Sequence, residues 1–184
     1  KKIIGYREAM TLPALPKSMV VVGSGAIGSE FANFYNTMGC QVTLVEFLPT
    51  VVPLEDEEVS KQLERSFKKA KMKVMTSSSV ESVDTSGKLC KVKIKTPKGE
   101  VEVEAEVVLS AVGVTPNLEN IGLEELGIEM ETGKVKVDDY YGTNVNGVYA
   151  IGDIVGGPAL AHVASAEGIT CVEKIAGHTP HPVD

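Results

Sequence analysis

The stretch "VVVGSGAIGSEFA", residues 20–32, places three glycines within six positions, directly after an apolar run that begins at Met19. Consecutive apolar residues bounded by glycine are typical of a buried strand. Beyond the glycines, apolar residues recur at helical spacing, at Ile27, Phe31, Phe34 and Met38. The stretch therefore predicts a strand, a glycine turn and a helix in succession.

Gly23, Gly25 and Gly28 match the pattern G-x-G-x-x-G, which is weak evidence by itself because loops match it by chance. Between a strand and a helix, however, the first glycine permits a tight turn and the second lets the backbone approach a pyrophosphate. The third lets the helix pack closely on the strand. The first amide groups of the helix then face the anion. The pattern predicts a dinucleotide site, and a glycine turn without a ligand is the alternative.

Glu46 ends the next predicted strand, "CQVTLVE", 18 positions after Gly28. An acid at this place accepts hydrogen bonds from both hydroxyls of the adenine ribose and repels a 2′-phosphate. No lysine or arginine lies between Glu46 and Lys61 to hold that phosphate. The sequence therefore favours NAD over NADP, with a solvated acid at a strand end as the alternative interpretation.

Patterns farther along the chain predict an α/β fold. Residues 56–72 form an amphipathic helix whose first turn is acidic and whose last turn is basic, and residues 107–113 are apolar throughout, as in a central strand. Between them, "VESVD", "LCKVKIKT" and "EVEVEAE" predict a three-stranded antiparallel meander. Together these elements predict a Rossmann-like domain, a parallel sheet with helices plus the meander, over residues 17–113.

The flanking regions are less regular. Residues 1–16 contain "LPALP" and are interpreted as a linker or edge segment. After residue 114 the elements are short, with strands expected near 134–137 and 148–151 and a helix over about 159–176. Such strands would normally join a larger sheet, and unpaired strand edges favour self-association or disorder.

Composition excludes several classes of function. The net charge is −7 and no basic run occurs, so neither a nucleic acid nor a membrane is expected as a partner. Three cysteines, Cys40, Cys90 and Cys171, are far apart, which predicts a reducing, cytoplasmic location and no disulfide scaffold or metal site. The chain begins at Lys1 without an initiator methionine and ends in a proline-rich tail, so we expect it to be a piece of a longer protein.

Five segments, "GSGAIGSE", "VEFL", "LSAVGVTPN", "NVNGVYAIGD" and "GPALAH", occur in this order. Together they resemble the flavin-dependent pyridine nucleotide-disulfide oxidoreductases over most of the chain. "GLEELGIE" together with "GPALAH" narrows the resemblance to the dihydrolipoyl dehydrogenase branch of that family. The resemblance implies that residues 114–184 complete the FAD-binding domain of a full-length enzyme.

The resemblance also implies residue roles. NAD would be held by Glu46 and by the loop and helix start, which comprise Gly23, Ser24, Gly25, Ala26, Ile27, Gly28, Ser29 and Glu30. Glu30 is either an acid that complements the helix dipole or a group facing the nicotinamide, and the two interpretations are equally favoured. Val80 would flank the adenine, and Gly113 would lie against the nicotinamide end.

For FAD, the resemblance implies that Asp153 accepts a hydrogen bond from the ribityl chain. It also implies that the start of a helix faces the flavin, at Ala159, Leu160, Ala161 and His162. From the residues alone, Asp153 is equally an N-cap or turn acid, and His162 is a surface or packing histidine.

The family's reaction also needs a redox cysteine pair, a glycine loop for FAD and a His–Glu dyad, none of which this sequence contains. We therefore expect no catalytic residue here, and no activity from this chain alone. The resemblance implies a full-length homodimer that oxidises dihydrolipoyl groups with NAD and FAD. Its partner would be the lipoyl-bearing protein of a 2-oxo acid dehydrogenase or glycine cleavage complex.

Three alternatives remain open at this level. The parent is a related NADH-dependent flavin oxidoreductase, such as a mercuric reductase or NADH oxidase. The segment is a non-catalytic module that senses NAD(H). The segment is a structural domain without a ligand.

Overall fold

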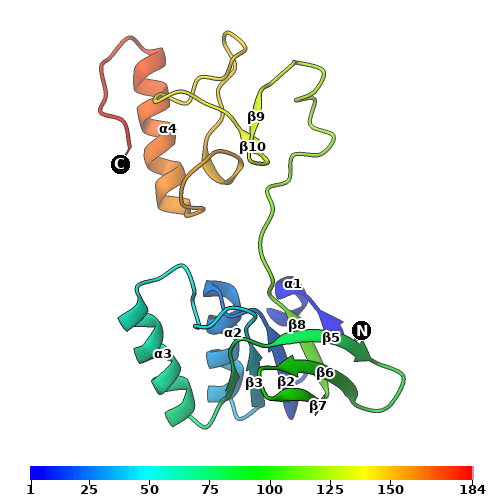
Figure 1. Cartoon of the computed structure of the whole chain (residues 1–184). Helices are drawn as coiled ribbons and strands as arrows, with labels where there is room; N and C mark the ends of the chain where they lie inside the picture. Colours follow the sequence, from blue (N-terminus) through cyan, green and yellow to red (C-terminus); the bar gives the residue numbers. More distant parts are fainter. Residues whose placement is uncertain (184) are drawn as a thin grey trace. The chain divides into compact units, whose positions relative to one another are not determined.

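The computed structural model describes residues 1–183, which fall into two compact units, Lys1–Gly113 and the residues from Val114 onward (Figure 1). We refer to them as unit 1 and unit 2 and describe each by itself.

Unit 1 is built on a parallel sheet with the strand order β1-β8-β2-β3-β4. Its strands are β1 (Ile3–Ile4), β2 (Ser18–Val22), β3 (Gln41–Val45), β4 (Lys73–Met75) and β8 (Val107–Ser110). Its helices are α1 (Tyr6–Ala9), α2 (Ala26–Thr37) and α3 (Glu57–Lys69). A separate antiparallel sheet contains β5 (Ser79–Asp84), β6 (Cys90–Thr96) and β7 (Gly99–Ala105). The predicted fold class is confirmed.

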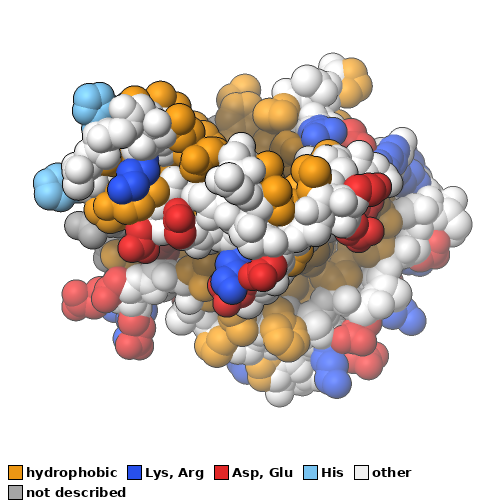
Figure 2. Space-filling model, turned by 90° about the horizontal axis from the view of Figure 1, so that it is seen from above, with side chains coloured by type: hydrophobic (Ala, Val, Ile, Leu, Met, Phe, Trp, Pro, Cys, Tyr) orange, Lys and Arg blue, Asp and Glu red, His pale blue; other side chains and the backbone are white. Residues whose placement is uncertain are grey.

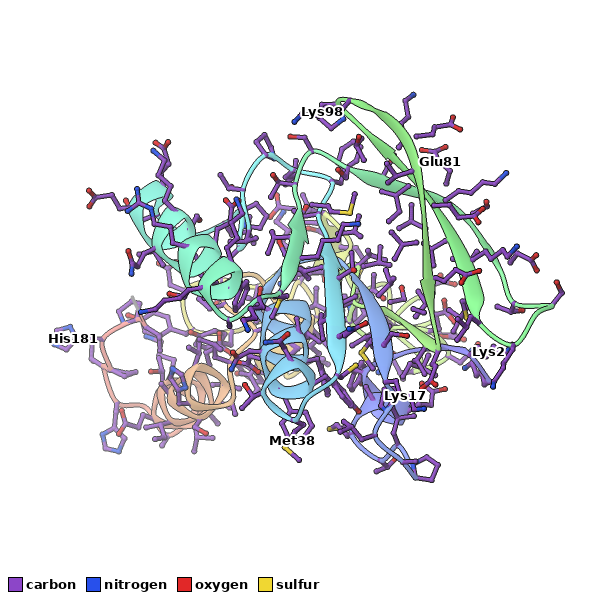
Figure 3. All side chains as sticks on the ribbon, turned by 90° about the horizontal axis from the view of Figure 1, so that it is seen from below. Lys2, Lys17, Met38, Glu81, Lys98 and His181 are labelled. Carbon is purple, nitrogen blue, oxygen red and sulfur yellow. The ribbon has the colours of Figure 1, made fainter. Side chains whose placement is uncertain are left out.

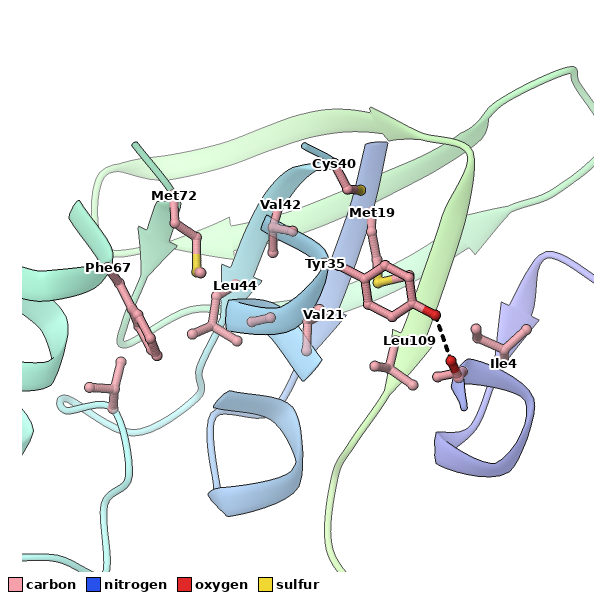
Figure 4. Close-up of a cluster of buried hydrophobic side chains, with 13 residues drawn as sticks. Ile4, Met19, Val21, Tyr35, Cys40, Val42, Leu44, Phe67, Met72 and Leu109 are labelled. Atoms are coloured by element: carbon pink, nitrogen blue, oxygen red, sulfur yellow. Dashed lines mark hydrogen bonds between the residues drawn. The ribbon is translucent and has the colours of Figure 1, made fainter. Parts of the chain in front are cut away.

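Residues 1–16, interpreted from sequence as a linker or edge segment, supply the edge strand β1 and the short helix α1. The Tyr35 hydroxyl on α2 donates a hydrogen bond of 2.5 Å to the carbonyl oxygen of Ala9 (Figure 4). This contact fastens α1 to α2 within the helix-side core.

Side chains of β2 alternate between two hydrophobic clusters, as the period of a strand requires. Met19 and Val21 belong to the cluster under the helices, which Figure 4 shows with Leu44, Phe67 and others. Val20 instead packs with the buried side chains of the meander. Because both faces are covered, every residue of β2 and β8 is apolar except Ser18 and Ser110 at the strand ends.

The meander pairs opposite charges on its exposed face, as its alternating pattern predicts. Lys91, Lys93 and Lys95 of β6 lie opposite Glu104, Glu102 and Glu100 of β7. On the other face, Val92 and Ile94 are fully buried. The Lys2 ammonium group donates to the carbonyl oxygens of Thr85 and Gly87 in the β5–β6 loop, beside which Figure 3 shows Lys2.

Unit 2 contains less regular structure. A short hairpin joins β9 (Met130–Glu131) to β10 (Lys134–Val135), a 3₁₀ turn, η1, spans Gly152–Ile154, and α4 spans Ala161–Ile175. A small core holds Ile128, Val135, Ala150 and Val155.

One expectation for unit 2 was wrong, and the start of the last helix shifts by two residues. Residues 148–151 are not a strand, since Tyr149 alone among them forms a bridge, to Gly142. The described residues place no longer strand next to this segment, so the pairing stops after one bridge. The last helix begins at Ala161 rather than near residue 159, because Leu160 has the extended backbone of an N-cap.

Charges are mixed over the surface. On the face seen in Figure 2, lysine and arginine side chains are interspersed with acidic ones, and the described residues form no basic patch there. Across residues 1–183, no helix has both the length and the apolar character needed to cross a membrane.

Candidate dinucleotide-binding site

At two of its three glycines, the turn after β2 leaves no room for a side chain. Gly23 has a φ of +94°, and a Cβ there would lie 2.6 Å from the carbonyl oxygen of Ala111. A Cβ on Gly28 would lie 1.9 Å from the carbonyl oxygen of Gly23, so α2 packs directly on the turn. Around Gly25, by contrast, a Cβ would meet nothing within 4 Å. The middle glycine therefore borders open space, where a ligand can approach the backbone.

The N-terminus of α2 offers uncapped amide groups at the same place. Its N-cap residue is Gly25, which has no side chain to accept from the first turn. That first turn also contains no acidic residue. The free N–H groups and the positive end of the helix dipole together favour an anion.

Glu46 follows β3 and is nearly buried, with 6% of its surface exposed, which excludes the alternative of a solvated acid at a strand end. Its Oε2 atom accepts hydrogen bonds from Ser24 N at 2.7 Å and Ser24 Oγ at 2.8 Å. Its Oε1 atom accepts a hydrogen bond from Leu48 N at 2.8 Å. The carboxylate is thus anchored to the glycine turn and to the loop after β3.

A cavity of about 400 Å³ connects three of the predicted residues, since Gly23, Glu46 and Val80 all line it. Other lining residues were not predicted from the sequence, among them Phe47, Ser78, Ser110 and Val112. They lie at or after the carboxyl ends of β3, β4 and β8, and this edge is where ligands bind in open α/β sheets. Phe47 directly follows the predicted strand that ends at Glu46, and that position is the sequence signal that could have identified it.

Several predicted NAD residues lie elsewhere. Ala26, Ser29 and Glu30 line a different hollow of about 390 Å³, together with Leu63 and Phe67 of α3. Glu30 itself is exposed. Ile27 is partly buried on α2, and Gly113 is exposed at the end of unit 1. The described geometry therefore gathers Gly23, Glu46 and Val80 around one cavity and leaves the others outside it.

In unit 2, the turn that carries Asp153 is held by a buried glutamate. Glu167 of α4 is 5% exposed, and its Oε2 atom accepts a hydrogen bond of 2.6 Å from Gly152 N. Asp153 is exposed. Gly152 has a φ of +77°, which a residue with a side chain rarely adopts.

The residues predicted to face the flavin are exposed as well, at Ala159, Leu160, Ala161 and His162. Leu160 is the N-cap of α4 and makes no side-chain capping bond, so the first amides of this helix are uncapped too. A cavity of about 320 Å³ in unit 2 is lined by Glu167 and Tyr141 but by none of the five predicted FAD residues.

All three cysteines are free and buried. Burial raises the pKa of the Cys40 thiol to about 11, and it raises the pKa of Cys90 and of Cys171 as well. These thiols therefore stay protonated near neutral pH, where a thiolate would be the reactive form. Within the described chain, no group of three or more His, Cys, Asp and Glu side chains is arranged to hold a metal ion.

This fold and glycine turn are those of a known family. The family model described as "Pyridine nucleotide-disulphide oxidoreductase" matches residues 1–168, and the chain belongs to that family. Members of this family are flavoproteins that use FAD and NAD(H).

Within the family, relatives named dihydrolipoyl dehydrogenase match nearly the whole chain, which confirms the narrower resemblance. The Rhizobium etli protein of that name is 47% identical over 100% of this chain and 39% of its own length. Dihydrolipoyl dehydrogenase 2, mitochondrial, of Arabidopsis thaliana is 42% identical over 98% of the chain and 36% of its own. The crystal structure of LpdA from Mycobacterium tuberculosis has a TM-score of 0.88 and 32% identity, covering 98% of this chain and 39% of that one. The chain thus spans about two fifths of the relatives it matches.

The residues of unit 1 fit NAD better than the residues of unit 2 fit FAD. For NAD, unit 1 combines a side-chain-free approach at Gly25, uncapped amides of α2 and a buried acid beside a cavity. For FAD, unit 2 presents an acid, Asp153, and uncapped amides of α4, all exposed.

Proposed function

We propose that unit 1 is the NAD-binding domain of a dihydrolipoyl dehydrogenase. The observation that carries the proposal is the cavity lined by Gly23, Glu46 and Val80, with the Glu46 carboxylate already buried and anchored. The family model and the names of the relatives support the same reading.

In this proposal, the pyrophosphate lies against Gly25 and the amides of α2, which include those of Ala26 and Ile27. The Glu46 carboxylate accepts a hydrogen bond from the adenine ribose and disfavours a 2′-phosphate, because the phosphate would bring a second negative charge next to a nearly buried carboxylate. Val80 packs against the adenine, and Gly113 leaves space beside the nicotinamide end.

Unit 2 would supply part of an FAD site. Asp153 would accept a hydrogen bond from the ribityl chain, and the uncapped amides of α4, from Leu160 to His162, would lie near the flavin. FAD, when bound, supplies the redox chemistry that links a dithiol to the nicotinamide. The share of this chain is to bind and orient the two cofactors.

For the whole protein we propose the oxidation of protein-bound dihydrolipoyl groups, dihydrolipoamide and NAD giving lipoamide and NADH. It would work as a homodimer in the cytoplasm, with the lipoyl-bearing protein of a 2-oxo acid dehydrogenase or glycine cleavage complex. The three cysteines of this chain are buried thiols of raised pKa, so we expect the 184-residue chain alone to show no NAD-linked oxidation of dihydrolipoamide in a spectrophotometric assay.

Calorimetric titration of the chain with NAD and with NADP tests the proposal. We expect NAD to bind more tightly, and Glu46→Ala to reduce that preference about tenfold or more, since a charged hydrogen-bond partner is lost. Glu46→Gln keeps the size of the side chain and removes its charge, and we expect it to reduce the preference as well.

Glu106→Gln is the matched control. The Glu106 carboxylate also accepts a backbone hydrogen bond, from Lys17 N at 2.8 Å, but it does not line the cavity. This variant should keep the preference of the wild-type chain. An unchanged NAD preference in Glu46→Ala, or no binding of NAD by the wild-type chain, would refute the proposal.

A further inference from the structure

Ser24 occupies a position of the glycine pattern where any residue is allowed, between Gly23 and Gly25. Its side chain is nevertheless fully buried. A buried hydroxyl needs a hydrogen-bond partner, and the Ser24 hydroxyl donates to Glu46 Oε2 at 2.8 Å. Because no part of Ser24 reaches the surface, its hydroxyl has no direct access to a ligand.

Every polar group of Ser24 is engaged. Its amide donates to the same Glu46 oxygen at 2.7 Å, while its carbonyl oxygen accepts from Ser29 Oγ at 2.8 Å and from Val52 N at 2.9 Å. One residue therefore ties the glycine turn to the end of β3, to α2 and to the loop before α3. The Glu46 carboxylate is therefore held by a buried residue whose other polar groups also form hydrogen bonds.

The two Ser24 donors have a consequence for the carboxylate. An ionised carboxylate oxygen has about two acceptor sites, and both sites of Glu46 Oε2 are occupied by Ser24. Within residues 1–183, Oε1 accepts a single hydrogen bond, from the Leu48 amide, and keeps one acceptor site. Oε1 is therefore the oxygen that remains to receive a ribose hydroxyl.

We propose that the Ser24 hydroxyl is a positioning group for coenzyme selection. By holding Oε2, it fixes the orientation in which Glu46 presents Oε1 and its negative charge to the adenine ribose. This inference rests on the proposed binding of NAD by unit 1. In this inference, Ser24 affects coenzyme binding by orienting Glu46 and does not contact the coenzyme itself.

Ser24→Ala tests the inference by removing one oxygen atom while the backbone amide still donates to Glu46. We expect the ratio of NAD affinity to NADP affinity, measured by calorimetric titration of the full chain, to fall by about threefold to tenfold. Ser24→Cys retains a weaker donor at the same position and should give a smaller fall.

Ser60→Ala is the matched control. Like Ser24, Ser60 is a buried serine whose hydroxyl donates a hydrogen bond. Its acceptor is the backbone carbonyl oxygen of Val52, at 3.3 Å, and Ser60 does not line the cavity. This variant should lower the melting temperature without changing the affinity ratio. A general loss of packing is thereby separated from a loss of orientation at Glu46.

A double-mutant cycle completes the test, because coupled residues give non-additive effects. In a Glu46→Ala background, Ser24→Ala should leave the affinity ratio unchanged. A Ser24→Ala ratio equal to the wild-type value overturns the inference, and so does an equal fall with and without Glu46. Absence of NAD binding by the wild-type chain would overturn the proposed function, and this inference with it.

Discussion

Both units contain a glycine turn whose backbone amide donates a hydrogen bond to a buried glutamate, but the surroundings of the two turns differ. In unit 1, the buried Glu46 accepts a hydrogen bond from the backbone amide of Ser24, which follows Gly23. In unit 2, a buried glutamate, Glu167, accepts the amide of Gly152. Both carboxylates fasten a glycine turn that has a positive φ.

The difference lies in what surrounds each turn. The first turn borders a cavity that its own glutamate lines, at the carboxyl edge of a parallel sheet. In the second turn, Asp153 is exposed on the surface. Glu167 lines a cavity there, but Asp153 does not. In unit 1 the fastened turn itself lines a cavity, through Gly23, whereas in unit 2 the cavity beside Glu167 is lined by neither Gly152 nor Asp153.

Substitution of the glycines is expected to show the largest contrast between the units. A Cβ at position 28 would lie 1.9 Å from a backbone oxygen, so we expect Gly28→Ala to cost unit 1 about 3 kcal/mol of unfolding free energy. In unit 2, a Cβ at Gly152 would lie 3.4 Å from the Ala164 side chain, and the positive φ alone should cost about 1 to 2 kcal/mol. Amide hydrogen exchange followed by NMR reports each unit separately.

Gly25→Ala is the control for these substitutions. Its Cβ would meet nothing within 4 Å, so we expect a stability change below about 1 kcal/mol together with weaker NAD binding. The contrast fails if Gly28→Ala is as stable as Gly25→Ala, or if Gly152→Ala is the more damaging of the two substitutions.

Removal of each glutamate is expected to have the next largest effect. Glu46→Ala leaves three donors without their partner, Ser24 N, Ser24 Oγ and Leu48 N, whereas Glu167→Ala leaves only Gly152 N. At about 1 kcal/mol or more for each orphaned buried donor, Glu46→Ala should destabilise unit 1 by about 3 kcal/mol and Glu167→Ala should destabilise unit 2 by about 1 kcal/mol. Urea denaturation monitored by amide signals from each unit measures both.

Glutamine variants sharpen this comparison, because Glu46→Gln and Glu167→Gln each retain a carbonyl acceptor. We expect Glu167→Gln to recover most of the stability that Glu167→Ala loses. Glu46→Gln should recover less, since an amide oxygen is a weaker partner than a carboxylate for three donors. Equal losses from the two alanine variants would show that the number of donors does not decide the cost.

The sequence was sufficient for those parts of the fold that depend on local pattern. The glycine turn, the dipole-matched helix α3 and the opposed charges of β6 and β7 all follow from spacing and charge. The order of strands in the parallel sheet does not, because it depends on contacts between distant segments. Ser78, Ser110 and Val112 line the cavity through that strand order, and no local pattern identifies them.

Within the site, Glu46 and Ser24 show which features a local sequence pattern can predict and which it cannot. An acid after the second strand of such a domain is predictable, since its distance from the glycines is part of the pattern. The burial of Ser24 and its two hydrogen bonds to Glu46 are not predictable, because the glycine pattern allows any residue at position 24. In unit 2, residues 148–151 have the composition of a strand, yet they form only one bridge because pairing requires a neighbour.

The smallest expected effect concerns the buried thiols of the two units. Burial raises the pKa of Cys40 from 9.0 to about 11. In the unfolded chain the thiol loses its proton near its ordinary pKa, so the unfolded state is favoured as the pH rises through this interval. Stability from this group is therefore fully present below pH 9 and is lost between about pH 9 and 11, by on the order of 1 kcal/mol. Urea denaturation at several pH values should show unit 1 declining over this interval.

Cys40→Ala should flatten that decline in unit 1 without abolishing it, because burial also raises the pKa of Tyr35, which packs in the same core cluster. Cys171→Ala should leave the decline of unit 1 unchanged, because Cys171 belongs to unit 2. The substitution effects are compared as slopes against pH, since each alanine also removes packing and lowers the stability at every pH. An identical slope in wild type and Cys40→Ala would mean that the thiol is not shielded from solvent, and the core under α2 would then be looser than its contacts indicate.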